Sequence, residues 1–281
     1  MPLSIIVQLE AAQAGRLEQF TGRGVHGFWF KRWKDVDPAL GDALHTESDV
    51  QSFTLSPLMG LPRPERGAVR ITPGLAAHFR VTALADGLAE AVKSKWMAGL
   101  AESGPVALPG PTETGAGPGS RSAPTGELTW RVIRAEVEAE TGYEALSKSH
   151  LMASVPPRQW TLDFVTPTTF HGAGSHLPFP LPDSLAGSWL RRWNAFAPIA
   201  LPKDDLLEWA RAKLVVSSYH LRTLPAREGE RLRVGCVGRL GLRALEMPPY
   251  LRAALDLLAH YAFYCGSGSH TGQGLVQTRV K

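Results

Sequence analysis

The same order of strand-like and helix-like segments occurs twice along the chain, and this repeat constrains the fold more than any other feature. In the first half, apolar and polar residues alternate over 3–10, as in a strand, and the apolar residues that follow recur at helical spacing. Two extended segments come next, then an amphipathic helix at 84–96 and a further extended segment at 127–139. The second half repeats this order, from alternating residues 160–165 to a strand-like run at 275–280. Strand, helix, two strands, helix, strand is the order of a ferredoxin-like βαββαβ unit. We therefore predict an α+β protein with two tandem ferredoxin-like folds, one in domain 1–152 and one in domain 153–281.

Length and composition are consistent with this fold. The 281 residues suffice for two domains, and the 44% hydrophobic content suffices for their cores. The net charge of +4 is a mild basic excess, compatible with a nucleic-acid partner. Cys236 and Cys265 each lie in an apolar stretch, which indicates buried, unpaired thiols in a reducing compartment. The first ten residues lack a basic n-region, and no apolar run approaches the roughly 18 residues of a membrane span. We expect a cytoplasmic protein without membrane contact.

A glycine-rich segment separates the last predicted helix, 250–264, from the last predicted strand. Glycine permits positive φ, and backbone N–H groups in such a loop can bind phosphates. The helix precedes the loop, so a dinucleotide-binding fingerprint is excluded, and the absence of Gly-Lys-Ser/Thr excludes a P-loop. The candidate contact residues here are Gly266, Gly268, Ser269, His270, Thr271, Gly272 and Gly274.

Two histidines near the N-terminus are candidate acid–base groups, because histidine titrates near neutral pH. His26 opens the predicted helix 25–34, and His45 ends a second predicted helix that begins at Asp37 and Pro38. One continuous helix from 26 to 45 would hold the two histidines about 28 Å apart, but a break at Pro38 lets the second helix fold back. Alternatively, His45 caps a helix C-terminus and His26 faces solvent.

The predicted strand 231–245 carries arginines on one side. Arg233, Arg239 and Arg243 alternate with an apolar set that comprises Val234, Cys236, Leu240 and Leu242, and Arg222 lies on the preceding strand. An arginine-lined strand face suits an RNA backbone. An ordinary solvated face fits the same pattern. Arg191 and Arg192, on the helix that Asp183 is expected to cap, are weaker candidates.

The other histidines form no recognisable metal motif. His171 and His176 lie five residues apart in a predicted loop, and the chain has no Cys-x-x-Cys or His-Glu-x-x-His. We therefore predict no metal and no cofactor.

Several segments together resemble a known family. They read Phe-Thr-Leu-Ser-Pro-Leu at 53–58, Leu-Asp-Phe-Val-Thr-Pro-Thr-Thr-Phe at 162–170, Leu-Arg-Thr-Leu at 221–224 and Gly-Cys-Val-Gly-Arg at 235–239, followed by the glycine-rich tail. In order and spacing they are similar to the CRISPR-associated repeat-processing endoribonucleases, the sixth Cas family of the RAMP superfamily. The likeness covers nearly the whole chain and is weakest over residues 60–124.

The resemblance implies metal-independent cleavage of CRISPR precursor RNA within its repeats. The ribose 2′-hydroxyl attacks the adjacent phosphate, which leaves a 2′,3′-cyclic phosphate and a 5′-hydroxyl. His45 matches the position of the family's active-site histidine, and His26 matches that of a second acid–base group. The lysine that often precedes the Phe-Thr strand is absent, since Gln51 and Ser52 stand there. Lys31, Arg32 and Lys34 are therefore candidate substitutes by their proximity in sequence.

The rival hypothesis is a RAMP-type subunit that binds guide RNA and does not cut it. The paired histidines favour the enzyme, and the missing lysine favours the rival. The implied partner is CRISPR repeat RNA; association with a CRISPR effector complex and homodimer formation are left open.

Overall fold

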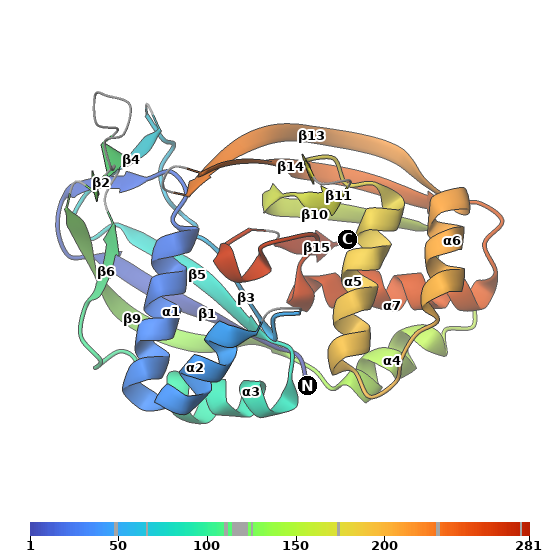
Figure 1. Cartoon of the computed structure of the whole chain (residues 1–281), viewed down its shortest axis with the longest axis horizontal. Coiled ribbons are helices and arrows are strands. Elements are labelled where there is room, and N and C mark those ends of the chain that lie inside the picture. Colours follow the sequence, from blue (N-terminus) through green and yellow to red (C-terminus); the bar gives the residue numbers. More distant parts are fainter. Residues whose placement is uncertain are drawn as a thin grey trace.

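Two antiparallel sheets lie side by side in the computed structural model, which describes residues 1–47, 50–65, 67–109, 112–113, 123–124, 126–172, 175–228, 231–275 and 277–281 (Figure 1). The first sheet has the strand order β3-β5-β1-β9-β6. Its strands are β1 (Leu3–Ala11), β3 (Phe53–Leu55), β5 (Ala76–Ala83), β6 (Val106–Pro109) and β9 (Glu127–Glu140). Its helices are α1 (Gly22–Val36), α2 (Pro38–Thr46) and α3 (Asp86–Ala91), which continues as a π-helical turn, Val92–Trp96.

The second sheet has the order β13-β14-β10-β15. Its strands are β10 (Gln159–Thr168), β13 (Leu214–Glu228), β14 (Arg231–Ala244) and β15 (Thr278–Val280). The helices of this half are α4 (Tyr143–Leu151), α5 (Pro182–Phe196), α6 (Lys203–Lys213) and α7 (Pro249–Cys265). The two-stranded ribbons pair β2 (Gly15–Glu18) with β4 (Ala68–Ile71), β7 (Thr112–Glu113) with β8 (Ala123–Pro124), and β11 (Phe170–Gly172) with β12 (Ser175–Leu177).

Both sheets have the ferredoxin-like arrangement. Apart from the additional edge strand β6, the strands of each sheet run second, third, first, fourth in chain order, and all neighbours are antiparallel. The predicted pair of tandem ferredoxin-like folds is confirmed.

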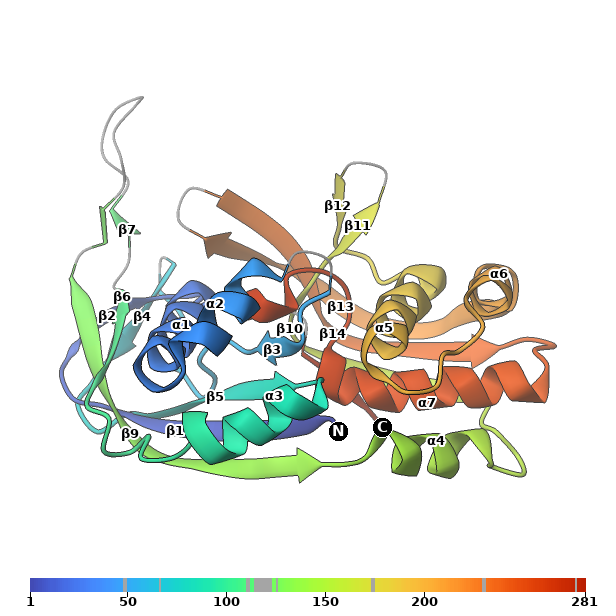
Figure 2. The same ribbon diagram turned by 60° about the horizontal axis from the view of Figure 1, so that its bottom comes forward.

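The two cores are formed by apolar side chains, which alternate with polar ones along the strands and recur at i, i+4 along the helices. In the first half, Ile5 and Val7 of β1 lie in the same core as Trp29 and Trp33 of α1, and all four side chains are buried. In the second half, Leu240 of β14 joins residues of α5 and α7 in a separate core. The boundary between residues 152 and 153 remains a prediction. Helix α4 precedes that boundary but packs against α7 of the second half (Figure 2).

The break between α1 and α2 lies where the sequence predicts it. The Asp37 carboxylate accepts a hydrogen bond from the backbone N–H of Leu40 at 3.1 Å, and Pro38 occupies the first turn of α2. Gly41 lets α2 approach α1, because a Cβ at that position would lie 3.0 Å from the Cβ of Trp33. Helix α2 therefore folds back along α1.

Several local expectations are wrong. The N-cap of α5 is Leu181, so Asp183 lies in the first turn instead of capping the helix. The sequence indicates a short loop at 13–24 and, from its glycine, proline, serine and threonine content, a loop at 103–126. Residues 15–18 nevertheless form β2 and residues 106–109 form an edge strand, because each finds a strand to pair with. Val234 is 39% exposed, since the β13–β14 hairpin extends beyond the rest of its sheet at that end. Among the described residues, no helix has the length and hydropathy that crossing a membrane requires.

Candidate active site

His26 and His45 both contact the same aromatic ring, that of Phe30. The centre of the His26 ring is 4.7 Å from that of Phe30, and the centre of the His45 ring is 5.0 Å from it. The two imidazole centres are therefore at most 9.7 Å apart. The turn at Asp37 and Pro38 thus brings to one place two histidines that a straight helix would hold far apart.

The surroundings of His26 favour its neutral form. Burial lowers the pKa of His26, and the positive charges of His45 and Arg23 lower it further. A neutral imidazole accepts a proton, so His26 is suited to be a base at neutral pH. His45 is exposed at the last turn of α2 and faces solvent.

The N-terminus of α1, one turn before His26, is held by two distant segments. The hydroxyl of Thr21 accepts a hydrogen bond from the N–H of Leu58 at 2.6 Å. Gly22 lies against the glycine-rich loop so closely that a Cβ on it would be 2.1 Å from the carbonyl oxygen of Gln273. This close approach fixes where α1 begins, and therefore where His26 points.

The glycine-rich loop itself is packed in the junction between the halves. Gly266, Gly268 and Gly274 have φ of 66°, 91° and 85°, and a Cβ on Gly268 would lie 2.2 Å from the carbonyl oxygen of Thr169. A Cβ on Gly272 would lie 2.3 Å from Oε1 of Gln51. Packing thus accounts for these glycines without RNA, and their contact with RNA remains a prediction.

Much of the loop backbone is already hydrogen-bonded. The N–H of Gly268 donates to the Ser188 hydroxyl at 3.2 Å, and the N–H of Ser269 donates to the carbonyl of Thr169 at 2.9 Å. Arg192, which is buried, donates to the carbonyl of Gly268 at 2.8 Å and to the hydroxyl of Thr271 at 3.3 Å. From sequence, Arg192 is a weaker candidate for contact with RNA, but it lies inside the protein and anchors the loop.

The position of the missing lysine carries no positive charge. Ser52 donates its hydroxyl hydrogen to Glu47 at 2.7 Å, and its backbone N–H donates to the same carboxylate at 2.8 Å. Gln51 lies against Gly272 of the loop. A cation that stabilises a charged transition state must therefore come from elsewhere in the site.

Two of the substitutes considered from sequence line a pocket between α1 and β6. Lys31 and Arg32 border it together with Arg23 and Gly27. Arg32 donates to the carbonyls of Trp96 and Ala98, which fixes the end of the π-helical turn. Arg23 was not singled out from the sequence, although it lies three residues before His26 and its charge acts on that histidine.

The arginines of the second sheet are arranged in two groups. Arg222, Arg239 and Arg243 are exposed on adjacent strands, and Arg239 pairs with Asp163 at 3.0 Å. Arg233 lies apart, with Nη1 2.5 Å from Nε2 of His270. Their contact with RNA remains a prediction.

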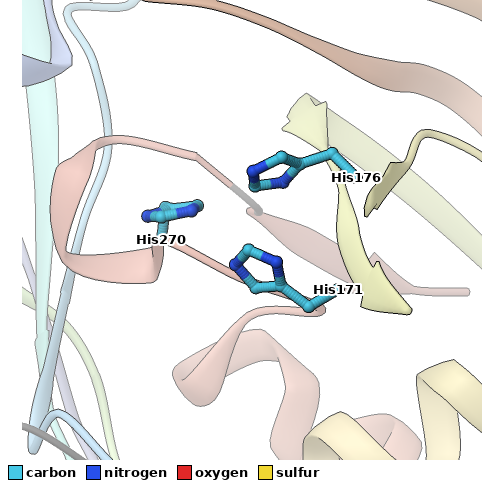
Figure 3. A group of neighbouring side chains, drawn as sticks. All are labelled: His171, His176 and His270. Atoms are coloured by element: carbon cyan, nitrogen blue, oxygen red, sulfur yellow. The ribbon is translucent and has the colours of Figure 1, made fainter. Parts of the chain in front are cut away.

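Two clusters of titratable groups were not predicted from the sequence. His171, His176 and His270 form a three-histidine cluster, with one ring nitrogen from each within 4.8 Å of the others (Figure 3). Burial lowers the pKa of His270 to about 4, helped by Arg233 and the other two histidines. Between α4 and α7, Asp256 accepts hydrogen bonds from His150 at 2.7 Å and Trp160 at 2.9 Å. Neither cluster could be found from spacing, because distant segments contribute to each.

Two ferredoxin-like folds and two neighbouring histidines on α1 and α2 can now be compared with known proteins. Residues 1–108 match the family model for the CRISPR Cas6 N-terminal domain, and residues 162–277 match that for the CRISPR-associated endoribonuclease Cas6. A comparison with curated proteins found no match.

Solved structures resemble the whole chain. A Cas6 of Thermus thermophilus in a product complex has 25% sequence identity and a TM-score of 0.75, with 100% of both chains covered. A second Cas6 product complex has 25% identity and a TM-score of 0.71, with 100% of this chain and 99% of that chain covered. The product of a Cas6-related gene from Pyrococcus furiosus shares the fold at 12% identity and a TM-score of 0.62, with 100% and 99% covered.

The fold and the junction therefore define a protein of the tandem ferredoxin-like class. The chain belongs to the CRISPR-associated endoribonuclease Cas6 family.

Proposed function

We propose that this protein cleaves CRISPR precursor RNA within its repeats without a metal ion, with His26 and His45 as its acid–base pair. His26 takes the proton from the ribose 2′-hydroxyl, and the resulting alkoxide attacks the adjacent phosphorus. His45 donates a proton to the leaving 5′-oxygen. The P–O5′ bond breaks as the new P–O2′ bond forms, so the products carry a 2′,3′-cyclic phosphate and a 5′-hydroxyl.

The observation that carries this proposal is the placement of both imidazoles around Phe30. One has a lowered pKa and is suited to accept a proton, and the other is exposed at a helix end. Arg23 is the third group in this proposal, because a guanidinium beside the base can stabilise charge on the phosphate. The complexes of the relatives with product and with a substrate mimic support RNA as the ligand.

RNA would reach this site across the junction. The exposed Arg222, Arg239 and Arg243 of the second sheet would hold its backbone, together with the half-buried Ser269 and His270 of the glycine-rich loop. Two free, buried thiols, Cys236 and Cys265, support a reducing cytoplasm as the place of action. Retention in a CRISPR effector complex and homodimer formation are further parts of this proposal.

The test is cleavage of a repeat RNA in excess EDTA. His26→Ala and His45→Ala should each slow single-turnover cleavage by about 100- to 10,000-fold, and a 2′-deoxy substitution at the cut site should abolish it. Lys148→Ala, at an exposed residue of α4 outside the proposed RNA-binding surface, is the control and should leave the rate unchanged. Cleavage that EDTA stops, or that persists in His45→Ala, would contradict the mechanism.

The rival function is RNA binding without cleavage. The uncharged position at Gln51 and Ser52 favours it, because it removes a cation that cleaving relatives often carry. In the same assay, tight binding of intact RNA by the wild-type protein would favour the rival.

A further inference from the structure

The three-histidine cluster lies outside the proposed acid–base pair. His171 of β11 and His176 of β12 face each other across the ribbon as a cross-strand pair. Their ring centres are 4.3 Å apart, and the centre of the His270 ring is 5.3 Å from that of His171 and 5.7 Å from that of His176. Figure 3 shows the three rings gathered around a common space.

The backbone holds these side chains together from two directions. The ladder of the ribbon fixes the two strand histidines on one face. The N–H of Ser269 donates to the carbonyl of Thr169 at 2.9 Å, which attaches the glycine-rich loop to the base of the same ribbon. His270 follows directly, with a left-handed backbone of φ 63° that turns its ring toward the pair.

The geometry points to a site for a divalent transition-metal ion of the Zn²⁺ type, bound by His171, His176 and His270. Each neutral imidazole offers one lone pair, and imidazole nitrogen is a preferred ligand of Zn²⁺, Ni²⁺ and Cu²⁺. Ligand nitrogens about 2.1 Å from a tetrahedral ion lie about 3.4 Å from one another. Here one ring nitrogen of each histidine already lies within 4.8 Å of the others. Side-chain rotations that move these nitrogens by about 1–2 Å would therefore place them at three corners of a tetrahedron.

Arg233 competes for this site. Its Nη1 lies 2.5 Å from Nε2 of His270 and 3.4 Å from Nε2 of His176, so it occupies lone pairs that an ion would use. Binding of an ion requires the guanidinium to swing away, and like-charge repulsion drives it in the same direction. The ion would then link the β11–β12 ribbon to the glycine-rich loop, which in turn abuts Gly22 of α1.

Equilibrium dialysis of the untagged full-length protein with Zn²⁺, in the absence of RNA, tests this inference. We expect one ion per chain, and His171→Ala and His176→Ala should each weaken binding by about 100-fold. Arg233→Gln should strengthen it several-fold, a direction that loss of structure would not produce. With Co²⁺ as the probe, the wild-type protein should develop the intense visible absorption of a low-coordinate site.

Matched controls separate this site from others. His260→Ala alters the cluster at Asp256 and should leave the affinity for Zn²⁺ unchanged. The inference is overturned if no ion binds, if His260→Ala alone reduces binding, or if the cluster binds inorganic phosphate and not Zn²⁺. Because the assay contains no RNA, its failure is distinct from failure of the proposed cleavage.

Discussion

At the scale of single residues, charge around His26 decides what that side chain can do. Burial is the main reason that its pKa is lowered, and His45 and Arg23 add to it. A positive charge on His45 or Arg23 thus opposes protonation of His26. The neutral His26 that results can accept a proton, as a general base must.

Replacement of His45 by Gln should therefore raise the pKa of His26. The reason is the loss of a neighbouring positive charge while burial is kept. NMR titration of the His26 ring measures this pKa directly, and Arg23→Gln should raise the same pKa. An unchanged His26 titration in both variants would show that the three groups do not interact.

A second residue-scale prediction concerns His260, whose hydrogen bond to Asp256 raises its pKa. A histidine whose pKa is raised on folding stabilises the folded state when it is protonated. This stabilisation is complete below the pKa of the unfolded chain, about 6.5, and is lost as the pH rises through the pKa of the folded state. His260→Gln should thus lose stability at pH 5.5 but much less at pH 8.5, relative to the wild-type protein. Urea unfolding at both pH values measures the difference. An equal loss at both would indicate lost packing instead of lost charge.

At the scale of elements, the glycine-rich loop packs between the two halves and contacts both. Its glycines are required where the loop touches Thr169, Gln51 and Gly22, and Arg192 holds it from inside. The loop therefore positions the start of α1, whatever further contact it makes with RNA.

Gly268→Ala should destabilise the protein by more than about 1 kcal/mol. The φ of 91° disfavours alanine, and the new Cβ would meet the Thr169 carbonyl at 2.2 Å. Gly27→Ala is the matched control, because its Cβ would meet nothing within 4 Å on α1. It should be neutral or stabilise by about 0.5–1 kcal/mol. Chemical denaturation distinguishes the two, and equal effects would refute the packing argument.

Sequence pattern predicted the order of elements and the fold-back at Pro38, because both depend on local spacing and turn chemistry. It did not reveal that the glycines meet Gly22, or that Arg192 lies inside, since these depend on how distant segments pack. Helix α6 and the short β2 were missed for the related reason that their partners stabilise them. Likewise, His26 and His45 could be paired from sequence, whereas His270 could not be joined to His171 and His176.

At the scale of the whole molecule, one buried arginine connects the two halves. Arg80 of β5 donates to the carbonyl of Phe263 on α7 at 2.6 Å, and its guanidinium carbon lies 3.9 Å from the centre of the Phe263 ring. It also pairs with Glu138 of β9 at 2.8 Å. Burial lowers the pKa of Arg80 to about 10, which still leaves it charged at neutral pH. The free-energy cost of burying the charged Arg80 side chain is thus offset by its contacts with both halves.

Arg80→Met should destabilise the protein by about 1.5–3 kcal/mol, because the Phe263 carbonyl loses a charged donor. Arg131→Met, which removes an exposed arginine paired with Glu10, should change stability by less than about 0.5 kcal/mol. Urea unfolding followed by tryptophan fluorescence and by circular dichroism provides the measurement. If the two variants unfold alike, Arg80 does not join the halves.

The contact between Gly22 and Gln273 joins positions 251 residues apart in the sequence. Ribosomes add about 5–20 residues per second, so α1 is synthesised about 13–50 s before the loop that fixes its N-terminus. During that interval a nascent first half can form its own sheet while its paired histidines lack their final support. The candidate active site is therefore completed late in synthesis, and a ribosome-bound first half should be inactive until the loop docks.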